Sequence, residues 1–136
     1  MTPLRLTMLA LIVAALLATS LVQARDFSTP VASRDGRYLL SYASELQPLV
    51  INRIHRWTLR LQLADGSSVE GARFSVSGGM PRHDHGLPTQ PIVTTELGEG
   101  IYVMEGMRFH MAGTWEIVVR IEAPSGNDTA IITAEL

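Results

Sequence analysis

From Gly36 to the C-terminus, the sequence consists of short alternating segments separated by turns, and this pattern rules out most folds. The clearest segment is "RWTLRLQL", in which every second residue is apolar: Trp57, Leu59, Leu61 and Leu63. Residues two apart on a strand share a face, so this segment predicts a strand with one buried side. It ends at Asp65-Gly66, a common turn pair.

Six further turn-bounded segments predict strands, at residues 36–43, 72–76, 91–97, 100–107, 114–123 and 128–136. No segment after residue 24 keeps a helical period, and the nearest one, "YASELQPLVI", is interrupted by Pro48. About seven short strands over roughly 100 residues are typical of an antiparallel β-sandwich of immunoglobulin-like type. We therefore predict an all-β fold.

The N-terminus has the features of a secretory signal peptide. Arg5 precedes an apolar run from Leu6 to Leu17, and the small-residue site Val22-Gln23-Ala24 follows. We predict a signal peptide at residues 1–24, a flexible lead at 25–36 and one domain at 37–136, in a protein exported to the periplasm. The alternative is that the segment is retained as a membrane anchor, although the run is short for a span of about 20 residues.

Charge and cysteine content restrict the partners. Without residues 1–24, ten arginines face thirteen acidic residues, a net charge of −3. This balance argues against nucleic acid or an anionic membrane surface as the partner. The sequence contains no cysteine, so the domain must be held by its core and cannot offer a thiolate to a metal. No small-molecule substrate is evident.

The stretch "SGGMPRHDHGLPTQP" contains the first candidate site. On an extended backbone His83 and His85 can point the same way, about 6.5 to 7 Å apart along the chain. Met80 lies just upstream. Two imidazoles with a nearby thioether suit copper, whereas zinc lacks four obvious ligands here. The alternative is that this stretch is a polar turn shaped by glycine and proline.

A second group lies in "YVMEGMRFHMAGTW". If "MRFHM" forms one strand, Met107, Phe109 and Met111 share a face, and the phenylalanine marks that face as core. His110 then faces outward and is the best third ligand, provided that its strand lies beside the His83–His85 loop. Met104 could face either way.

Other polar residues give little support for catalysis. His55, among arginines before a strand, is interpreted as a surface residue. No spacing pairs two carboxylates for acid–base work, and no Gly-x-Ser-x-Gly is present. We predict that the protein is not an enzyme.

Three motifs in order, "MPxHxHGLPTxP", "LGxGxYxxEGMxFxM" and "GxWEI", resemble the YtkA-like domain, a family of small exported bacterial β-sandwiches akin to the FixH proteins. The resemblance covers roughly Arg56 to Glu122. FixH proteins are associated with assembling copper-containing oxidases in the membrane, so the resemblance implies copper delivery or holding.

Two hypotheses result. In the first, the protein binds copper through His83, His85, Met80 and His110 and serves a membrane or envelope cuproprotein as a carrier or accessory factor. In the second, it is a metal-free interaction module that docks on an envelope or membrane complex.

Overall fold

The structure, a computed structural model, describes residues 25–136, so the predicted signal peptide lies outside the described residues. This part of the chain forms nine strands and no helix. The strands are β1 (Val31–Ala32), β2 (Tyr38–Ser44), β3 (His55–Leu63), β4 (Arg73–Met80), β5 (His85–Gly86), β6 (Ile92–Gly98), β7 (Ile101–Met107), β8 (Thr114–Ala123) and β9 (Gly126–Glu135). Within these residues, no helix has the length and apolar character needed to cross a membrane.

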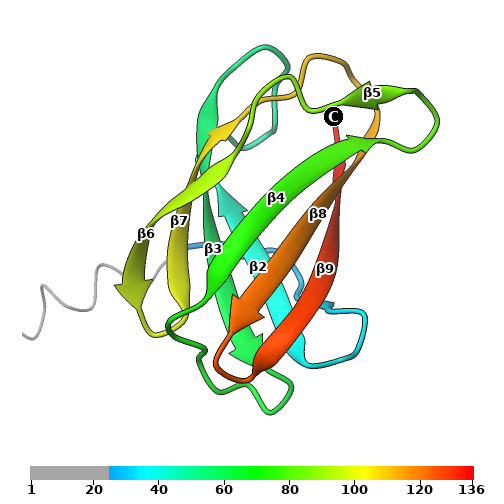
Figure 1. Cartoon of the computed structure of the whole chain (residues 1–136). Coiled ribbons are helices and arrows are strands. Elements are labelled where there is room, and N and C mark those ends of the chain that lie inside the picture. The colour runs from blue at the N-terminus through cyan, green and yellow to red at the C-terminus, as the bar shows by residue number, and fades with distance from the viewer. Residues whose placement is uncertain (1–24) are drawn as a thin grey trace, which may run out of the picture.

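The strands form two antiparallel sheets packed face to face (Figure 1). One sheet has the order β1-β2-β3-β7-β6 and the other the order β5-β4-β8-β9. Seven strands have seven or more residues, while β1 and β5 have two each. The predicted all-β sandwich of about seven strands is therefore confirmed.

The core lies between the central strands, where the predicted alternation holds. Trp57, Leu59 and Leu61 of β3 are fully buried. From β8, the inward side chains are again every second residue: Trp115, Ile117, Val119 and Ile121. Burial of two tryptophans and a row of branched aliphatics supplies the main stabilisation of a domain that has no disulfide.

The lead before β2 packs against the outer face of the five-stranded sheet. Ser28 N–H donates to the Tyr42 carbonyl at 2.7 Å. The Arg60 guanidinium lies over the Phe27 ring, 3.9 Å from its centroid, and Arg25 donates to the Thr58 hydroxyl. The chain therefore enters the domain across β2 and β3.

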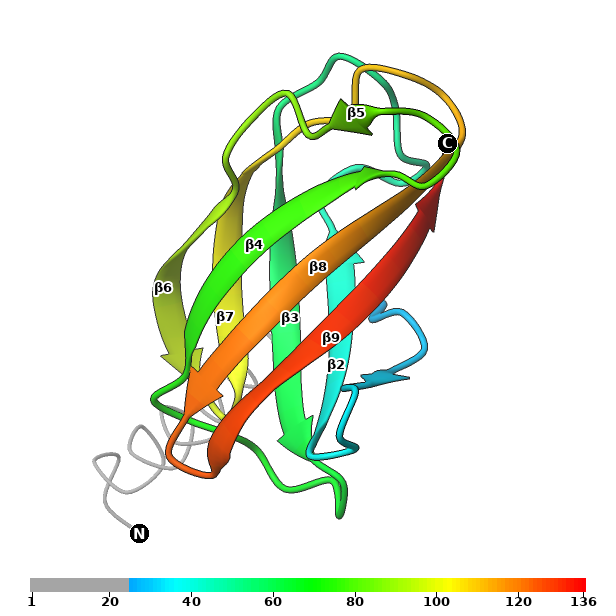
Figure 2. The same cartoon turned by 45° about the vertical axis from the view of Figure 1, so that its right-hand side comes forward.

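Three loops meet at one end of the sandwich (Figure 2). They are the β2–β3 loop at residues 45–54, the β4–β6 connection at residues 81–91, which includes β5, and the β7–β8 loop at residues 108–113. We call this end, defined by these three loops, the histidine end, because it carries His83, His85 and His110.

The opposite end is held by a buried carboxylate. Asp128 of β9 accepts a 2.5 Å hydrogen bond from the Ser33 hydroxyl and further bonds from the backbone N–H groups of Asp35 and Arg37. Its own neighbour Thr129 donates a fourth bond through its backbone N–H. This carboxylate fixes the β1–β2 turn onto β9.

Candidate metal site

Two glycines allow the β4–β5 hairpin to close. Gly79 pairs with Gly86, and Met80 pairs with His85. A Cβ on Gly79 would lie 2.9 Å from the His85 carbonyl oxygen, so no other residue fits without movement. The His83 N–H donates to the Met80 carbonyl at 3.1 Å, which makes the turn tight. The glycines in "SGGM" therefore serve the architecture of the loop that carries the histidines.

His83 and His85 are both exposed on this hairpin. Their ring centroids lie 6.1 Å apart with an angle of 27° between the ring planes. Asp84, between them, is exposed as well. The histidine pair thus lies at the surface, accessible to an ion from solvent.

His110 of the β7–β8 loop lies beside this pair. Its ring centroid is 5.8 Å from that of His85, and the ring is half-buried. Its Nδ1 atom is buried with no hydrogen-bond partner in the described part of the chain. On its other side His110 meets the ring of Trp115, with 5.4 Å between centroids. The structure therefore places the predicted third ligand next to the hairpin.

The spacings fit two-histidine ligation, but they do not form a finished three-ligand site. An ion bound to two imidazole nitrogens at about 2 Å keeps the ring centres at most about 6.4 Å apart. Both ring pairs fall within that reach. Across residues 25–136, however, no three His, Asp or Glu side chains are arranged to hold an ion as they stand. Exposed histidine side chains would have to rotate to converge.

Met80 lies beneath the histidines rather than at the surface. It is only 5% exposed. Because directly paired residues of an antiparallel hairpin point to the same face, Met80 and His85 share a face. Its terminal methyl reaches the β7–β8 loop, 2.9 Å from where a Cβ on Gly113 would stand. The thioether therefore lies between the two loops that bear histidine.

The remaining methionines of the described residues belong largely to the core. Met104 and Met107 are fully buried, and Met111 is half-buried against the core. The condition that "MRFHM" forms one strand is not met, because β7 ends at Met107, its first residue, and the chain then turns. The Trp115 indole N–H donates to the Met111 carbonyl at 3.0 Å, which holds that turn against β8.

His55 corrects a further expectation. It is 4% exposed, not a surface residue. It begins β3, and both of its ring nitrogens are used by neighbouring groups of the same segment. Its two hydrogen bonds leave no nitrogen free for a metal.

The segment from Leu87 to Pro91 crosses from one sheet to the other and is tied to both. The Thr89 hydroxyl donates to the Gly106 carbonyl of β7 at 2.5 Å. The Gln90 side-chain amide donates to the Val76 carbonyl of β4 at 3.1 Å. The "GLPTQP" motif is thus a fixed crossover that follows the histidines.

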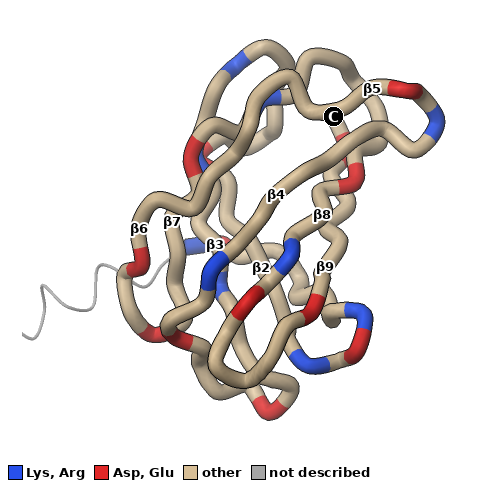
Figure 3. The backbone as a smooth tube through the Cα atoms, in the orientation of Figure 1, with Lys and Arg blue, Asp and Glu red and all other residues tan. Residues whose placement is uncertain are grey.

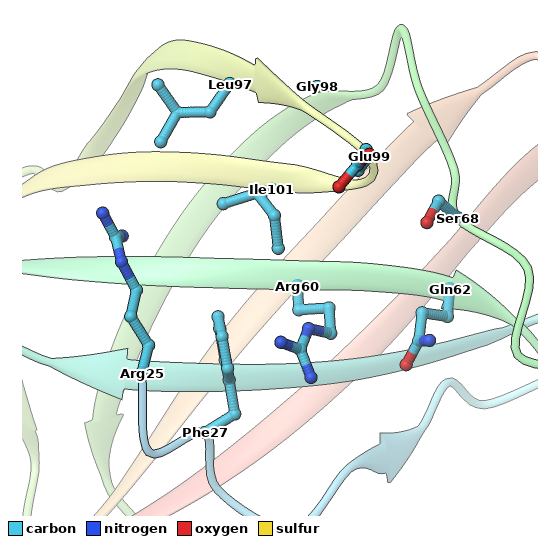
Figure 4. Close-up of a pocket in the computed structure, with 9 residues that line it drawn as sticks. All are labelled: Arg25, Phe27, Arg60, Gln62, Ser68, Leu97, Gly98, Glu99 and Ile101. Carbon is cyan, nitrogen blue, oxygen red and sulfur yellow. The ribbon is translucent and has the colours of Figure 1, made fainter. Parts of the chain in front are cut away.

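A hollow on the surface lies away from the histidines (Figure 4). It has a volume of about 560 Å³ and opens on the outer face of the five-stranded sheet. Its lining includes the β6–β7 turn at Gly98 and Glu99, whereas His110 follows the other end of β7. Arg25, Phe27 and Arg60 line it from the side of the lead. No histidine or methionine lines it, so it is separate from the candidate metal site.

Sequence reasoning missed two residues of this region, Trp115 and Gly113. Trp115 falls in the strand predicted at residues 114–123, and its ring also contacts His110. Gly113 leaves the space into which Met80 extends. The adjacency of both to "FHM" in "FHMAGTW" is the signal that could have drawn attention to them.

Comparison with known proteins supports the motif-based resemblance. The family model described as YtkA-like matches residues 33–120, from the β1–β2 turn into β8. No curated protein and no solved structure matches the chain. The family model spans more than half of the sequence and includes the three candidate histidines. The chain therefore belongs to the YtkA-like family.

Proposed function

We propose that this protein is an exported copper-binding protein that acts as a carrier or accessory factor for a membrane or envelope cuproprotein. The observation that carries the proposal is the row of three imidazoles, 6.1 Å and 5.8 Å between neighbouring ring centres, contributed by two separate loops. The buried Nδ1 of His110, which has no hydrogen-bond partner among residues 25–136, adds a further nitrogen donor.

The donor chemistry favours copper over zinc. Imidazole nitrogens accept either oxidation state of copper, and a thioether prefers Cu(I). His85 and His110 would bind first because their ring centroids lie 5.8 Å apart, and His83 would complete the set. Asp84 would remain outside the ligands. An ion held by two or three neutral donors in an exposed position suits transfer to a partner rather than permanent storage.

A second candidate is the metal-free interaction module. The specific observation in its favour is that the described residues contain no finished three-donor group. On this view the hairpin is a rigid recognition loop, and its histidines are polar turn residues.

A competition titration separates the two. Residues 25–136 carry both sheets and the core between them, so they are expected to fold as a unit, which a cooperative thermal melt checks first. They are then titrated with Cu(I) and with Cu(II) against chelators of known affinity. We expect one equivalent to bind, with quenching of tryptophan fluorescence by Cu(II), because Trp115 lies against His110.

The variants identify the ligands. We expect His83→Ala/His85→Ala and His110→Ala each to weaken binding by about 100-fold or more, a larger loss than the 10–100-fold typical of residues that only support a ligand. Arg82→Ala, in the same exposed turn but with no donor for copper, is the matched control. Binding that survives the histidine variants would leave the metal-free module as the better description.

A further inference from the structure

The β2–β3 loop exposes an unusual group of aliphatic side chains. Val50, Ile51 and Ile54 are 39%, 45% and 68% exposed. Of the five large hydrophobic residues exposed in residues 25–136, these three lie within five positions of one loop. Single exposed aliphatics are ordinary on a protein surface, whereas a group at a loop tip marks a contact site.

The β2–β3 loop is held in position by hydrogen bonds to the β7–β8 loop. The Asn52 N–H donates to the Phe109 carbonyl at 2.7 Å, and the Arg108 guanidinium donates to the Asn52 side-chain oxygen at 3.2 Å. Asn52 has a φ of 60°, a left-handed conformation that asparagine tolerates better than most residues. The β2–β3 loop is therefore fixed to the loop that carries His110, and the aliphatic tip belongs to the histidine end.

Arginines accompany the aliphatic tip. Arg53 lies between Ile51 and Ile54 and makes no ion pair within the described residues. Arg56, at the base of the loop, forms an ion pair with Glu105, with 3.5 Å between Nε and Oε1. Figure 3 shows both basic and acidic residues along the loops at this end of the sandwich. Aliphatic side chains beside an unpaired arginine match the boundary between lipid acyl chains and anionic headgroups.

The described chain begins near the base of this loop. Arg25 and Asp26 line a hollow together with Glu45, Gln47 and Arg56, at the base of the same loop. In the sequence, the apolar run from Leu6 to Leu17 lies shortly before Arg25. If residues 1–24 are retained as a membrane anchor, the alternative to a signal peptide, this apolar run would join the domain near the base of the β2–β3 loop.

We infer that the β2–β3 loop is a bilayer contact, which inserts Val50, Ile51 and Ile54 into the membrane interface and turns the histidine end toward the lipid. Binding would come from burial of aliphatic surface, so electrostatic repulsion between the net charge of −3 and anionic lipids would not prevent it. Three partly exposed side chains give weak, reversible affinity, which suits a second contact beside another anchor or partner. The inference does not depend on copper.

The test uses polarity-sensitive labels. Because the sequence has no cysteine, residues 25–136 with Ile54→Cys can be labelled at one position. Leu97→Cys, at a side chain 53% exposed near the opposite end, is the matched control. Both are mixed with vesicles of phosphatidylethanolamine and phosphatidylglycerol in the presence of EDTA. We expect the label at position 54 to brighten and shift to the blue, and the label at position 97 to remain unchanged.

Vesicle sedimentation of unlabelled protein provides the second measurement. We expect Ile51→Ser/Ile54→Ser to lower the partition coefficient by about tenfold or more, and Leu97→Ser to leave it unchanged. Equal responses at positions 54 and 97, or none at millimolar lipid, would overturn the inference. A fluorescence change at position 54 that occurs only with membranes that retain their proteins would also overturn the inference, because the partner would then be a protein. Chelation of metals throughout keeps this outcome separate from that of the copper titration.

Discussion

The indole N–H of Trp57 donates a 3.1 Å hydrogen bond to Nε2 of His55, and both side chains are buried. Nδ1 of the same imidazole lies 3.0 Å from the Arg53 carbonyl. The imidazole is therefore the neutral tautomer with its proton on Nδ1, because Nε2 must accept. This pair links the base of the β2–β3 loop to the aromatic core, where the ring of Phe109 lies 6.0 Å from that of His55.

Removing this imidazole should destabilise the fold. His55→Ala leaves the Trp57 N–H unpaired in the core and opens a cavity, so we expect the free energy of unfolding to fall by about 2–4 kcal/mol. Chemical denaturation measures the loss. His85→Ala, at an exposed site, should change stability by less than about 0.5 kcal/mol. A similar small effect for both variants would contradict the structural role of His55.

Acid should weaken the protein through Asp128. Burial raises the pKa of this carboxyl, but the hydrogen bonds from Ser33 and from three backbone N–H groups outweigh it, so the pKa lies below its ordinary value of 3.8. A carboxyl with a lowered folded-state pKa stabilises the fold above its unfolded-state pKa. That stabilisation is lost as the pH falls through the folded-state pKa.

Asp128→Asn isolates this contribution. At neutral pH we expect the variant to be about 1–3 kcal/mol less stable than the parent, because the amide cannot accept from all four donors. The difference should shrink as the pH falls from about 4, the unfolded-state pKa, through the lower folded-state pKa of the parent carboxyl. Denaturation curves across this range provide the check, and a difference that stays constant with pH would argue against it.

The two paired glycines of the hairpin should respond differently to alanine. A Cβ on Gly79 meets the His85 carbonyl oxygen at 2.9 Å, whereas one on Gly86 meets its nearest neighbour, the Gly78 carbonyl oxygen, at 3.7 Å. We expect Gly79→Ala to cost about 1–3 kcal/mol by overpacking and Gly86→Ala to cost much less. Thermal melts compare the two variants. Equal costs would mean that the hairpin closes differently.

Leucine substitutions should distinguish Met80, the proposed copper ligand, from the methionines that only pack in the core. Met80→Leu keeps the volume of the side chain but removes the sulfur, so we expect weaker binding of Cu(I) with little change for Cu(II). Met104→Leu and Met107→Leu, in the core, should leave both affinities unchanged and cost less than about 1.5 kcal/mol in stability. The same chelator competition measures all three. Loss of Cu(II) binding in Met80→Leu would point to a distorted hairpin instead of a missing ligand.

The strands could be predicted from the sequence because apolar and polar residues alternate strongly along them. Residues 114–123 were predicted as one strand, and β8 has those bounds, since apolar β-branched residues and Trp115 fill every inward position. β4 was predicted only as far as Val76 because the glycines that follow have no side chain to show alternation. Those glycines continue the strand and bring β5 against it.

The candidate metal site could be predicted only in part from the sequence. The sequence shows that His83 and His85 are neighbours, but the approach of His85 to His110 depends on how the two sheets pack. Met80 is buried because β4 continues as far as Met80 and places it on the inward face with Val76, whereas the strand was predicted only to Val76. His55 was misjudged because its flanking arginines are exposed while the indole of Trp57 draws the imidazole inward.

The tethers on the crossover have a kinetic consequence. Because Thr89 and Gln90 tie the segment after the histidines to both sheets, the hairpin is not a free lid. Ion capture would then need only rotation of exposed imidazole side chains, a motion of picoseconds to nanoseconds, and no slow opening of the backbone. Release would be limited by breaking metal–nitrogen bonds, so an acceptor that supplies a competing ligand at the histidine end would accelerate the transfer.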